Sequence, residues 1–440
     1  MSEEAGPTPS AGPGDHASTS EEAAGSGAIG RVTVATLIAA ASGYLVLLLA
    51  ARDLGPAGYA VFAVFWAAYG MVTGAQNGQL QETTRAVRAN VESRDRADDG
   101  DRARPWLTNV LVGVALGALV AVTSPLWSGH VFSEYRWLSV ALLSVGVASF
   151  AVYAHLAGAL SGTVSWGPFA ALLSVDALIR LVASVVAVVL GLGLVAFLVI
   201  TVVGSVSWML LLIGSSSARR CVGLPADVPT HRFTANTVTA MAAAAASAVL
   251  VMGFPVLINA TDGIGGRADA ATVGAVVLAV TLTRAPLLVP LNSFQGVLIT
   301  RFVDGRHRLM TALQAPVAAV TAIGVVGAGA AWLIGPWLLT TVFGADYRLS
   351  GSALAGLTLG ATAVALLTIT GAAAVATAAH RWYAAGWWVA TIASILLLLL
   401  PLDVQTRVVV ALIGGPVVGM VVHLAGLAAR SRPAAPATRD

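Results

Sequence analysis

Long apolar runs alternate with short polar, glycine- or proline-containing breaks along nearly the whole chain. Most runs are about 20 residues long, the length that an α-helix needs to cross the hydrocarbon core of a bilayer. Twelve of them are predicted to be membrane-spanning helices, at residues 29–51, 59–79, 106–127, 137–160, 169–190, 194–213, 233–259, 271–296, 310–334, 352–379, 384–400 and 408–427. A buried core helix is the alternative for any single run, but twelve runs in series favour an all-α integral membrane protein.

The breaks between these runs contain a repeat. The stretches 125–136 and 336–348 each contain a proline, then Val-Phe after six residues, then Tyr-Arg. Phe132 and Phe343 are 211 residues apart, close to half of the 440-residue chain. In both copies the proline is predicted to stop a helix, with an aromatic patch at the membrane interface and an acid near the start of the next helix.

This repeat predicts a tandem duplication of six spans. Because six is an even number, both halves enter the membrane from the same side, and they are expected to form two six-helix bundles related by a pseudo-two-fold axis along the membrane normal. The expected organisation is a disordered tail, a first bundle, a linker, a second bundle and a second tail, at 1–28, 29–214, 215–232, 233–428 and 429–440.

Composition agrees with the pattern and removes several classes of function. The chain is 57% hydrophobic and 10% charged, with a mean hydropathy of +0.84, which is far from an ordinary soluble domain. A formal net charge of +3 is too small to indicate a nucleic-acid partner. The one cysteine excludes an intramolecular disulfide, and His155, His380 and His423 lack metal-ligand spacing, so no metal site is expected.

The arginines predict the orientation, since cytoplasmic loops carry an excess of positive charge. All 24 basic side chains are arginine. With both termini in the cytoplasm, 17 lie on the inner side, five lie on the outer side and two lie within spans. The richness in Ala, Val, Gly and Arg is typical of a GC-rich bacterial genome, so we expect a multi-pass protein of the bacterial plasma membrane.

Two of the breaks resemble a known family. The sequence ARDLGPAGYAVF at 51–62 is similar to the turn between helices one and two of Wzx-type polysaccharide flippases, members of the MOP exporter superfamily. The sequence FGADY at 343–347 resembles a second landmark of that family, and QETTR at 81–85 is similar to its actinobacterial branch. The residues that carry the two turn motifs are Arg52, Gly55, Pro56, Tyr59, Phe343, Gly344 and Tyr347.

The resemblance covers the chain after residue 29 and implies a MOP/MATE-like fold with a 12-span core. It implies a carrier that flips undecaprenyl-pyrophosphate-linked oligosaccharide from the inner to the outer leaflet by alternating access. Glycan polymerases and glycosyltransferases would then be partners, beside the lipid bilayer and the lipid-linked glycan itself. A MATE-like small-molecule or drug antiporter, and a non-transporting member of a glycan-assembly complex, are the alternatives.

An enzyme is not expected. The outer loops are all short, which leaves no room for an extracellular catalytic domain, and the chain has no P-loop for ATP. No cofactor is expected either, although a coupling ion, H⁺ or Na⁺, is compatible with the sequence.

Ionisable residues inside the spans are the first candidates for a substrate site, because each costs about 2.5–3.5 kcal/mol to insert at mid-membrane. Asp176 and Arg180 are one helical turn apart, and they form either a self-neutralising pair or part of a polar cavity wall. Arg284 has no acid in its span, and Pro286 and Pro290 are expected to bend the helix beside it. It is predicted to bind a diphosphate in a cavity; pairing with Asp176, or snorkelling to the interface, is the alternative.

Amides near the inner membrane surface are the second group of candidates. Asn77 and Asn292 occupy equivalent places in the duplication, and Gln76 lies beside the first of them. They either line an inner vestibule and bond sugar hydroxyls or are solvated helix ends.

Overall fold

The computed structural model describes residues 13–92, 102–261, 268–304, 309–377 and 379–431. All regular elements in these ranges are helical. The first half contains α1 (Pro13–Glu92), α2 (Pro105–Val131), α3 (Arg136–Gly162), α4 (Trp166–Val189), α5 (Gly193–Val203), η1 (Gly204–Val206), α6 (Ser207–Gly214) and α7 (Ser216–Val222). The second half contains α8 (Thr230–Val251), α9 (Phe254–Ala260), α10 (Ala270–Asp304), α11 (Leu309–Phe343), α12 (Gly351–Ala376), α13 (His380–Leu398) and α14 (Val404–Ser431).

Ten helices in the described ranges are long and apolar enough to cross a membrane. The longest, α1, contains two arms joined at Gly55, whose φ of 63° and ψ of 177° are not helical. Glycine adopts this left-handed region without a steric penalty, and Pro56 fixes the start of the second arm. Because α1 is one of these ten and contains two spans, its second arm and helix α13 bring the number to the predicted twelve, although the span predicted at 233–259 is broken between α8 and α9.

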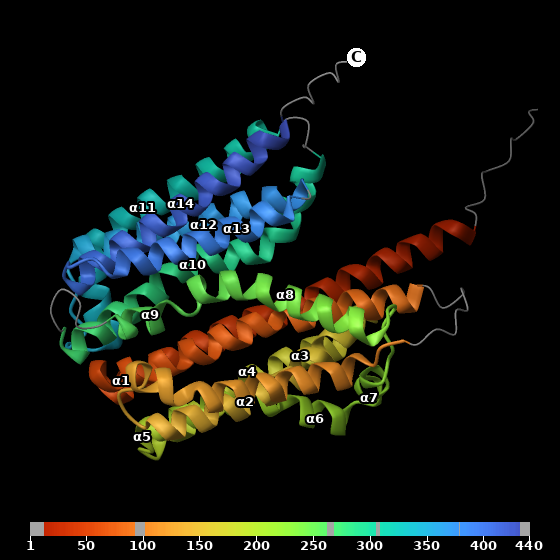
Figure 1. Ribbon diagram of the computed structural model, residues 1–440, viewed down its shortest axis with the longest axis horizontal. Helices are drawn as coiled ribbons and strands as arrows, with labels where there is room; N and C mark the ends of the chain where they lie inside the picture. The colour runs from red at the N-terminus through yellow and green to blue at the C-terminus, as the bar shows by residue number, and fades with distance from the viewer. Residues whose placement is uncertain (1–12, 93–101, 262–267, 305–308, 378, 432–440) are drawn as a thin grey trace, which may run out of the picture.

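The helices form two bundles, one from each half of the chain (Figure 1). Helix α1 begins and α14 ends at the same end of the molecule, which we call the terminal end; the bend at Gly55 marks the opposite, distal end. Helix α8 packs against the second arm of α1, where Gly74 and Gly78 allow close approach. A Cβ at Gly78 would collide with the backbone of Met241.

The prolines of the repeat do not stop their helices, so that expectation is wrong. Helix α2 continues past Pro125 to Val131, and α11 continues past Pro336 to its last residue, Phe343. A proline leaves the carbonyl four residues earlier without its helical donor. For Pro125 this carbonyl is that of Ala121, and the Ser124 hydroxyl donates to it over 2.7 Å. A neighbouring side chain therefore compensates for the missing bond.

The segments expected to lie outside the bundles are partly helical. The linker expected at 215–232 contains α7, whose first turn is capped because Ser215 Oγ accepts from the Ala218 amide. Residues 1–12 and 432–440 lie outside the described ranges, but α1 begins at Pro13, within the tail expected at 1–28. Several alanines and glutamates in this stretch favour the helical extension.

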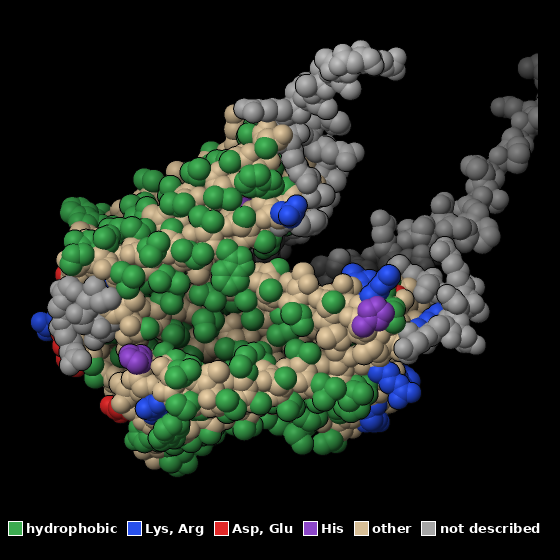
Figure 2. Space-filling view, viewed as in Figure 1, with side chains coloured by type: hydrophobic (Ala, Val, Ile, Leu, Met, Phe, Trp, Pro, Cys, Tyr) green, Lys and Arg blue, Asp and Glu red, His purple; other side chains and the backbone are tan. Residues whose placement is uncertain are grey.

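Large apolar side chains cover the outside of both bundles. Leu126 is 81% exposed on α2 and Val326 is 73% exposed on α11. Figure 2 shows this apolar surface between two ends where the charged and histidine side chains gather, and it shows a hollow between the bundles. A continuous exposed apolar surface of this extent is the mark of helices surrounded by lipid.

Candidate substrate cavity between the bundles

A deep pocket lies between the two bundles. Its volume is about 170 Å³, and it is lined by both arms of α1, by the α8–α9 break and by α10. From the first half it takes three aromatic side chains, those of Tyr44, Tyr59 and Trp66. From the second half its polar lining includes Arg284 and Thr281. The pocket is therefore mostly apolar and aromatic, with one charged side chain.

A backbone carbonyl at the α8–α9 break holds Arg284 in this pocket. Helix α8 ends at Val251 and α9 begins at Phe254, so the chain breaks here. Pro255 has no N–H, which leaves the Val251 carbonyl without its helical donor. Arg284 Nη1 donates to this carbonyl over 2.6 Å, and its Cζ lies 5.3 Å from the centre of the Phe254 ring. The α8–α9 break thus fixes the guanidinium.

The guanidinium nevertheless keeps unused donors. Arg284 is only 6% exposed, and its Nε and Nη2 have no hydrogen-bond partner among the described residues. Burying a charge without a partner is costly, because it loses water and gains nothing in return. An anion in the pocket would supply the missing acceptors, and the two adjacent N–H groups suit a bidentate phosphate or carboxylate.

The Asp176–Arg180 pair lies elsewhere. Arg180 Nη2 donates to Asp176 Oδ1 over 2.9 Å along α4, and Gly204 of η1 packs directly on the two side chains. The guanidinium also lies 5.8 Å from the Trp66 ring, within the first bundle. Of the two arrangements that the sequence allows, the structure therefore has the self-neutralising pair. Asp176 pairs with Arg180 and not with Arg284.

A second, more polar pocket adjoins the first. Its volume is about 370 Å³, and Val251, Met252 and Leu288 line both pockets. Its distinctive lining includes amides, hydroxyls and aromatic rings, from Asn77, Gln81, Ser247, Thr368, Tyr383 and Trp387.

The amide candidates separate into different environments. Asn77 is exposed in the second pocket. Gln76 is fully buried and donates through Nε2 to the Val147 carbonyl over 3.0 Å, so it ties α1 to α3 and faces away from the pocket. Asn292 belongs to α10, but its side chain lies outside the described part of the structure.

Several lining residues were missed by the sequence analysis. Gln81 lies one helical turn after Asn77 and shares its face, which was a usable signal. The aromatic lining, Tyr44, Trp66, Tyr383 and Trp387, carried no such signal, because aromatic residues in apolar runs are indistinguishable from membrane-facing ones.

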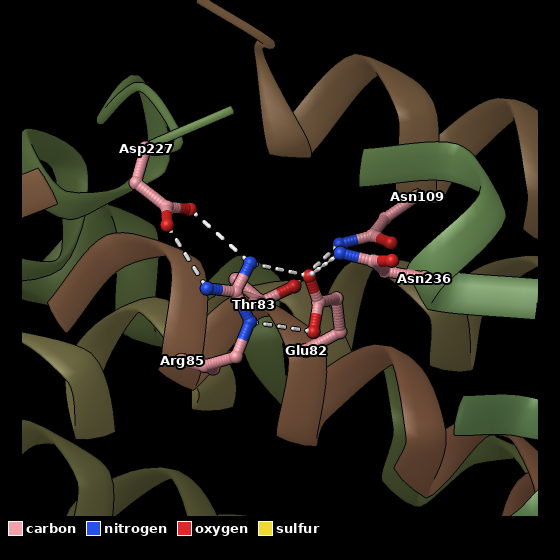
Figure 3. Close-up of polar contacts among 6 residues, drawn as sticks. All are labelled: Glu82, Thr83, Arg85, Asn109, Asp227 and Asn236. Atoms are coloured by element: carbon pink, nitrogen blue, oxygen red, sulfur yellow. Dashed lines mark hydrogen bonds and ion pairs between the residues drawn. The ribbon is translucent and has the colours of Figure 1, made fainter. Parts of the chain in front are cut away.

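A polar network at the terminal end connects the bundles (Figure 3). Arg85 donates to Glu82 and, over 2.9 Å, to Asp227, which precedes α8. Glu82 also accepts from Asn236 Nδ2 of α8 over 3.1 Å. This network fixes α8 to the second arm of α1, which explains the polar QETTR stretch. Nearby, Asn109 donates to the Thr83 hydroxyl over 2.8 Å.

The turn-motif residues gather at the distal end. Gly55 and Pro56 form the bend of α1, Tyr59 contacts Tyr347 edge-on with 6.2 Å between ring centres, and Phe343 contacts Tyr347 at 6.4 Å. Of these residues only Tyr59 also lines the deep pocket. Arg52 reaches the other bundle by contacts described below.

Metal ligands are not clustered in the described ranges: no three His, Cys, Asp or Glu side chains there are close enough to hold a metal ion. His155 contacts the Val222 carbonyl and His423 the Tyr383 carbonyl, each at 3.1 Å, and the His380 side chain lies outside the described part.

The fold of this chain is similar to that of solved membrane transporters of the MOP superfamily. A multidrug transporter of the MATE family, in an inward-facing conformation, is similar to this structure with a TM-score of 0.71 and 14% identity. The likeness covers 93% of this chain and 100% of that one. The expectation of a MOP/MATE-like fold is therefore confirmed.

Close relatives come from mycobacteria. An uncharacterized protein of Mycobacterium bovis is 50% identical over 403 residues, which are 92% of each chain. An uncharacterized protein of Mycobacterium tuberculosis is 50% identical over 405 residues, again 92% of each chain. No protein-family model matches the sequence. The chain belongs to the family of these mycobacterial proteins.

Proposed function

We propose that this protein carries a pyrophosphate-linked lipid oligosaccharide across the bacterial plasma membrane by alternating access, with its terminal end in the cytoplasm. The observation that carries the proposal is the Arg284 guanidinium, buried between the bundles with Nε and Nη2 unpartnered among the described residues. The arginine excess on the terminal side supports the orientation.

The chemistry of the deep pocket favours an anionic group of the cargo. A guanidinium binds phosphate oxygens through two parallel N–H···O bonds, and in a low-dielectric pocket this charge-assisted contact is strong. The Val251 carbonyl occupies only one nitrogen of Arg284, so the remaining donors are pre-oriented for such a contact. A cation would be repelled by the same charge.

The adjoining pocket suits the sugar part. Asn77 and Gln81 present amide donors and acceptors, and Tyr383 and Trp387 present rings. Sugar hydroxyls need such paired hydrogen-bonding groups, whereas the apolar faces of a pyranose pack on aromatic rings. The two adjoining pockets thus offer separate places, the deep pocket to a pyrophosphate and the more polar pocket to a glycan.

A small-molecule antiporter is the second candidate, favoured by the likeness of the fold to multidrug transporters. It would bind its substrate through the aromatic groups of the deep pocket, Tyr44, Tyr59 and Trp66. Cationic drugs are disfavoured because Arg284 faces that pocket and the acid of the described mid-span pair, Asp176, is already bonded to Arg180.

Purified protein in liposomes separates these functions. A fluorescent short-chain polyprenyl-pyrophosphate glycan in the outer leaflet should become protected from a membrane-impermeant quencher only in vesicles that contain the protein. A cationic dye under a proton or sodium gradient should not accumulate. Dye accumulation without movement of the lipid would overturn the proposal in favour of the antiporter.

A further inference from the structure

The two turn motifs, 290 residues apart, form a direct contact between the bundles at the distal end. Arg52 Nε donates to the Val342 carbonyl over 2.6 Å, and its Nη2 donates to the Thr341 carbonyl over 3.0 Å. Helix α11 ends at Phe343, so these carbonyls belong to its last turn, where no intrahelical donors remain. A cation is favourable there, because the carbonyl end of a helix carries partial negative charge. Arg52 of the first bundle therefore caps α11 of the second.

A second hydrogen bond joins the same two helix ends, with its donor in the second bundle and its acceptor in the first. Tyr347, just after α11, donates its hydroxyl to the Ala51 carbonyl over 2.9 Å. Ala51 is buried in the last turn before the bend at Gly55. Each helix end thus satisfies a carbonyl of the other, and Tyr347 is only 1% exposed.

A related cap exists on the other side of the duplication. Asn259, near the end of α9, donates through Nδ2 to the Val131 carbonyl over 2.8 Å, and Val131 is the last residue of α2. Val131 and Val342 immediately precede the repeated phenylalanines, and they too are 211 residues apart. Arg52 and Asn259 each lie at the end of the first span of their half. The first span of each bundle therefore caps the third span of the other.

The two caps differ in strength. Arg52 is charged and makes two bonds, whereas Asn259 is neutral and makes one. Tyr135, the counterpart of Tyr347 in the repeat, is 48% exposed and does not return the contact. The Arg52 cap is therefore the stronger of the pair, since charged hydrogen bonds are worth roughly twice neutral ones.

We propose that these crossed helix caps, Arg52 on α11 and Asn259 on α2, are a pair of latches that hold the distal end closed. The inference rests on the proposed alternating access: to open the central pocket at that end, the bundles must separate and both caps must break. Because water replaces broken hydrogen bonds at an exposed end, the latches bias the equilibrium without preventing opening.

Spin-label distances test the latches without any substrate. Labels at Ala57→Cys and Ala345→Cys, both exposed at the distal end, report the separation of the bundles in a Cys221→Ser background. A second pair at Ser216→Cys and Ala429→Cys reports on the terminal end. Arg52→Ala should raise the population with a wide distal distance roughly tenfold, with a shorter terminal distance in the same molecules.

The variants form an ordered series. Asn259→Ala should give a smaller increase than Arg52→Ala, and the double variant should exceed both. Arg348→Ala is the matched control, because Arg348 is an exposed distal arginine whose Nε donates locally to the Ala345 carbonyl. It should match the wild type.

If Arg52→Ala is too unstable to purify, Arg52→Lys tests the same contact, because lysine keeps the charge but loses the two-pronged geometry. The latch proposal would be overturned if a folded double variant had wild-type distances at both ends. The double variant is Arg52→Ala/Asn259→Ala, or Arg52→Lys/Asn259→Ala if the first cannot be purified. That outcome would leave the proposed cargo untouched, since no cargo enters the experiment. Conversely, a wild-type protein that moves no lipid would refute the cargo and leave the latches standing.

Discussion

Arg180 and Arg284 are both buried within membrane spans, yet their surroundings are opposite. Arg180 pairs with an acid one turn away on its own helix, inside one bundle. Arg284 sits between the bundles on a carbonyl freed by a proline, with Nε and Nη2 unpartnered among the described residues. The first side chain is neutralised within the protein, whereas the second is positioned for a partner that comes from outside it. Arg180 Nε also lacks a hydrogen-bond partner among the described residues, so the decisive difference is the acid that neutralises Arg180.

Arg284→Ala should have the largest effect on cargo binding. Hydrogen bonds to a charged group contribute about 1.5–3 kcal/mol, so the affinity for a polyprenyl-pyrophosphate should fall roughly ten- to a hundredfold. The fall should be measured on purified protein by tryptophan fluorescence. Unchanged affinity, with the protein folded, would show that Arg284 resembles Arg180 in having only a structural role.

Arg284→Lys should lie between the wild type and alanine. An ammonium keeps the charge but not the fork that binds two phosphate oxygens, so about half of the loss in binding free energy should be recovered. The same titration tests this. Equal behaviour of lysine and alanine would mean that charge alone contributes nothing.

Asp176→Asn should mainly lower stability, because it leaves the Arg180 charge without its ion-pair partner. Removing one member of a buried pair costs about 3–5 kcal/mol, and residual exposure of both side chains places this pair at or below the lower end. Thermal unfolding in detergent should show a lower Tm, and Asp176→Asn/Arg180→Gln should recover part of it. Cargo affinity of the folded single variant should stay within about threefold of the wild type. A larger loss would place the pair in the cargo site.

Asn77→Ala and Gln81→Ala should have the smallest effects. Each removes one neutral hydrogen-bonding group from an open pocket, so affinity for a lipid-linked glycan should fall about two- to tenfold, or about 0.5–1.5 kcal/mol. The same variants should bind the polyprenyl-pyrophosphate without sugars as well as the wild type does. A loss that is equal for both ligands would remove the second pocket from sugar recognition.

The spans were predictable because an apolar run of membrane length has no water to bond its backbone groups, and a helix satisfies these groups within the run itself. The bend at 51–62 was predictable for a local reason, since Gly55-Pro56 disfavours a straight helix. The continuation of α2 past Pro125 was not, because it depends on whether a neighbour such as Ser124 supplies the missing bond.

The site was predictable only in part. Arg284 could be selected from its lack of an acid in the same span, but its acceptor is the Val251 carbonyl, 33 residues away, which no local pattern reveals. Gln76 and Asn77 are adjacent in sequence, yet a helix rotates about 100° between them, so one is buried and one faces the pocket. The reach of Arg52 to α11, across 290 residues, likewise follows from the packing of the bundles and from no feature of either motif alone.

The most direct test of the account is lipid translocation in liposomes by wild-type and Arg284→Ala protein, with Arg348→Ala as control. The cargo should be offered in two forms, a polyprenyl-pyrophosphate glycan and the matching neutral polyprenyl glycoside. The account predicts that wild type and Arg348→Ala move the pyrophosphate form much faster than the neutral form, and that Arg284→Ala loses this difference. If the Arg284→Ala protein still moved the pyrophosphate form faster than the neutral form, by the same factor as the wild type, the account would be contradicted.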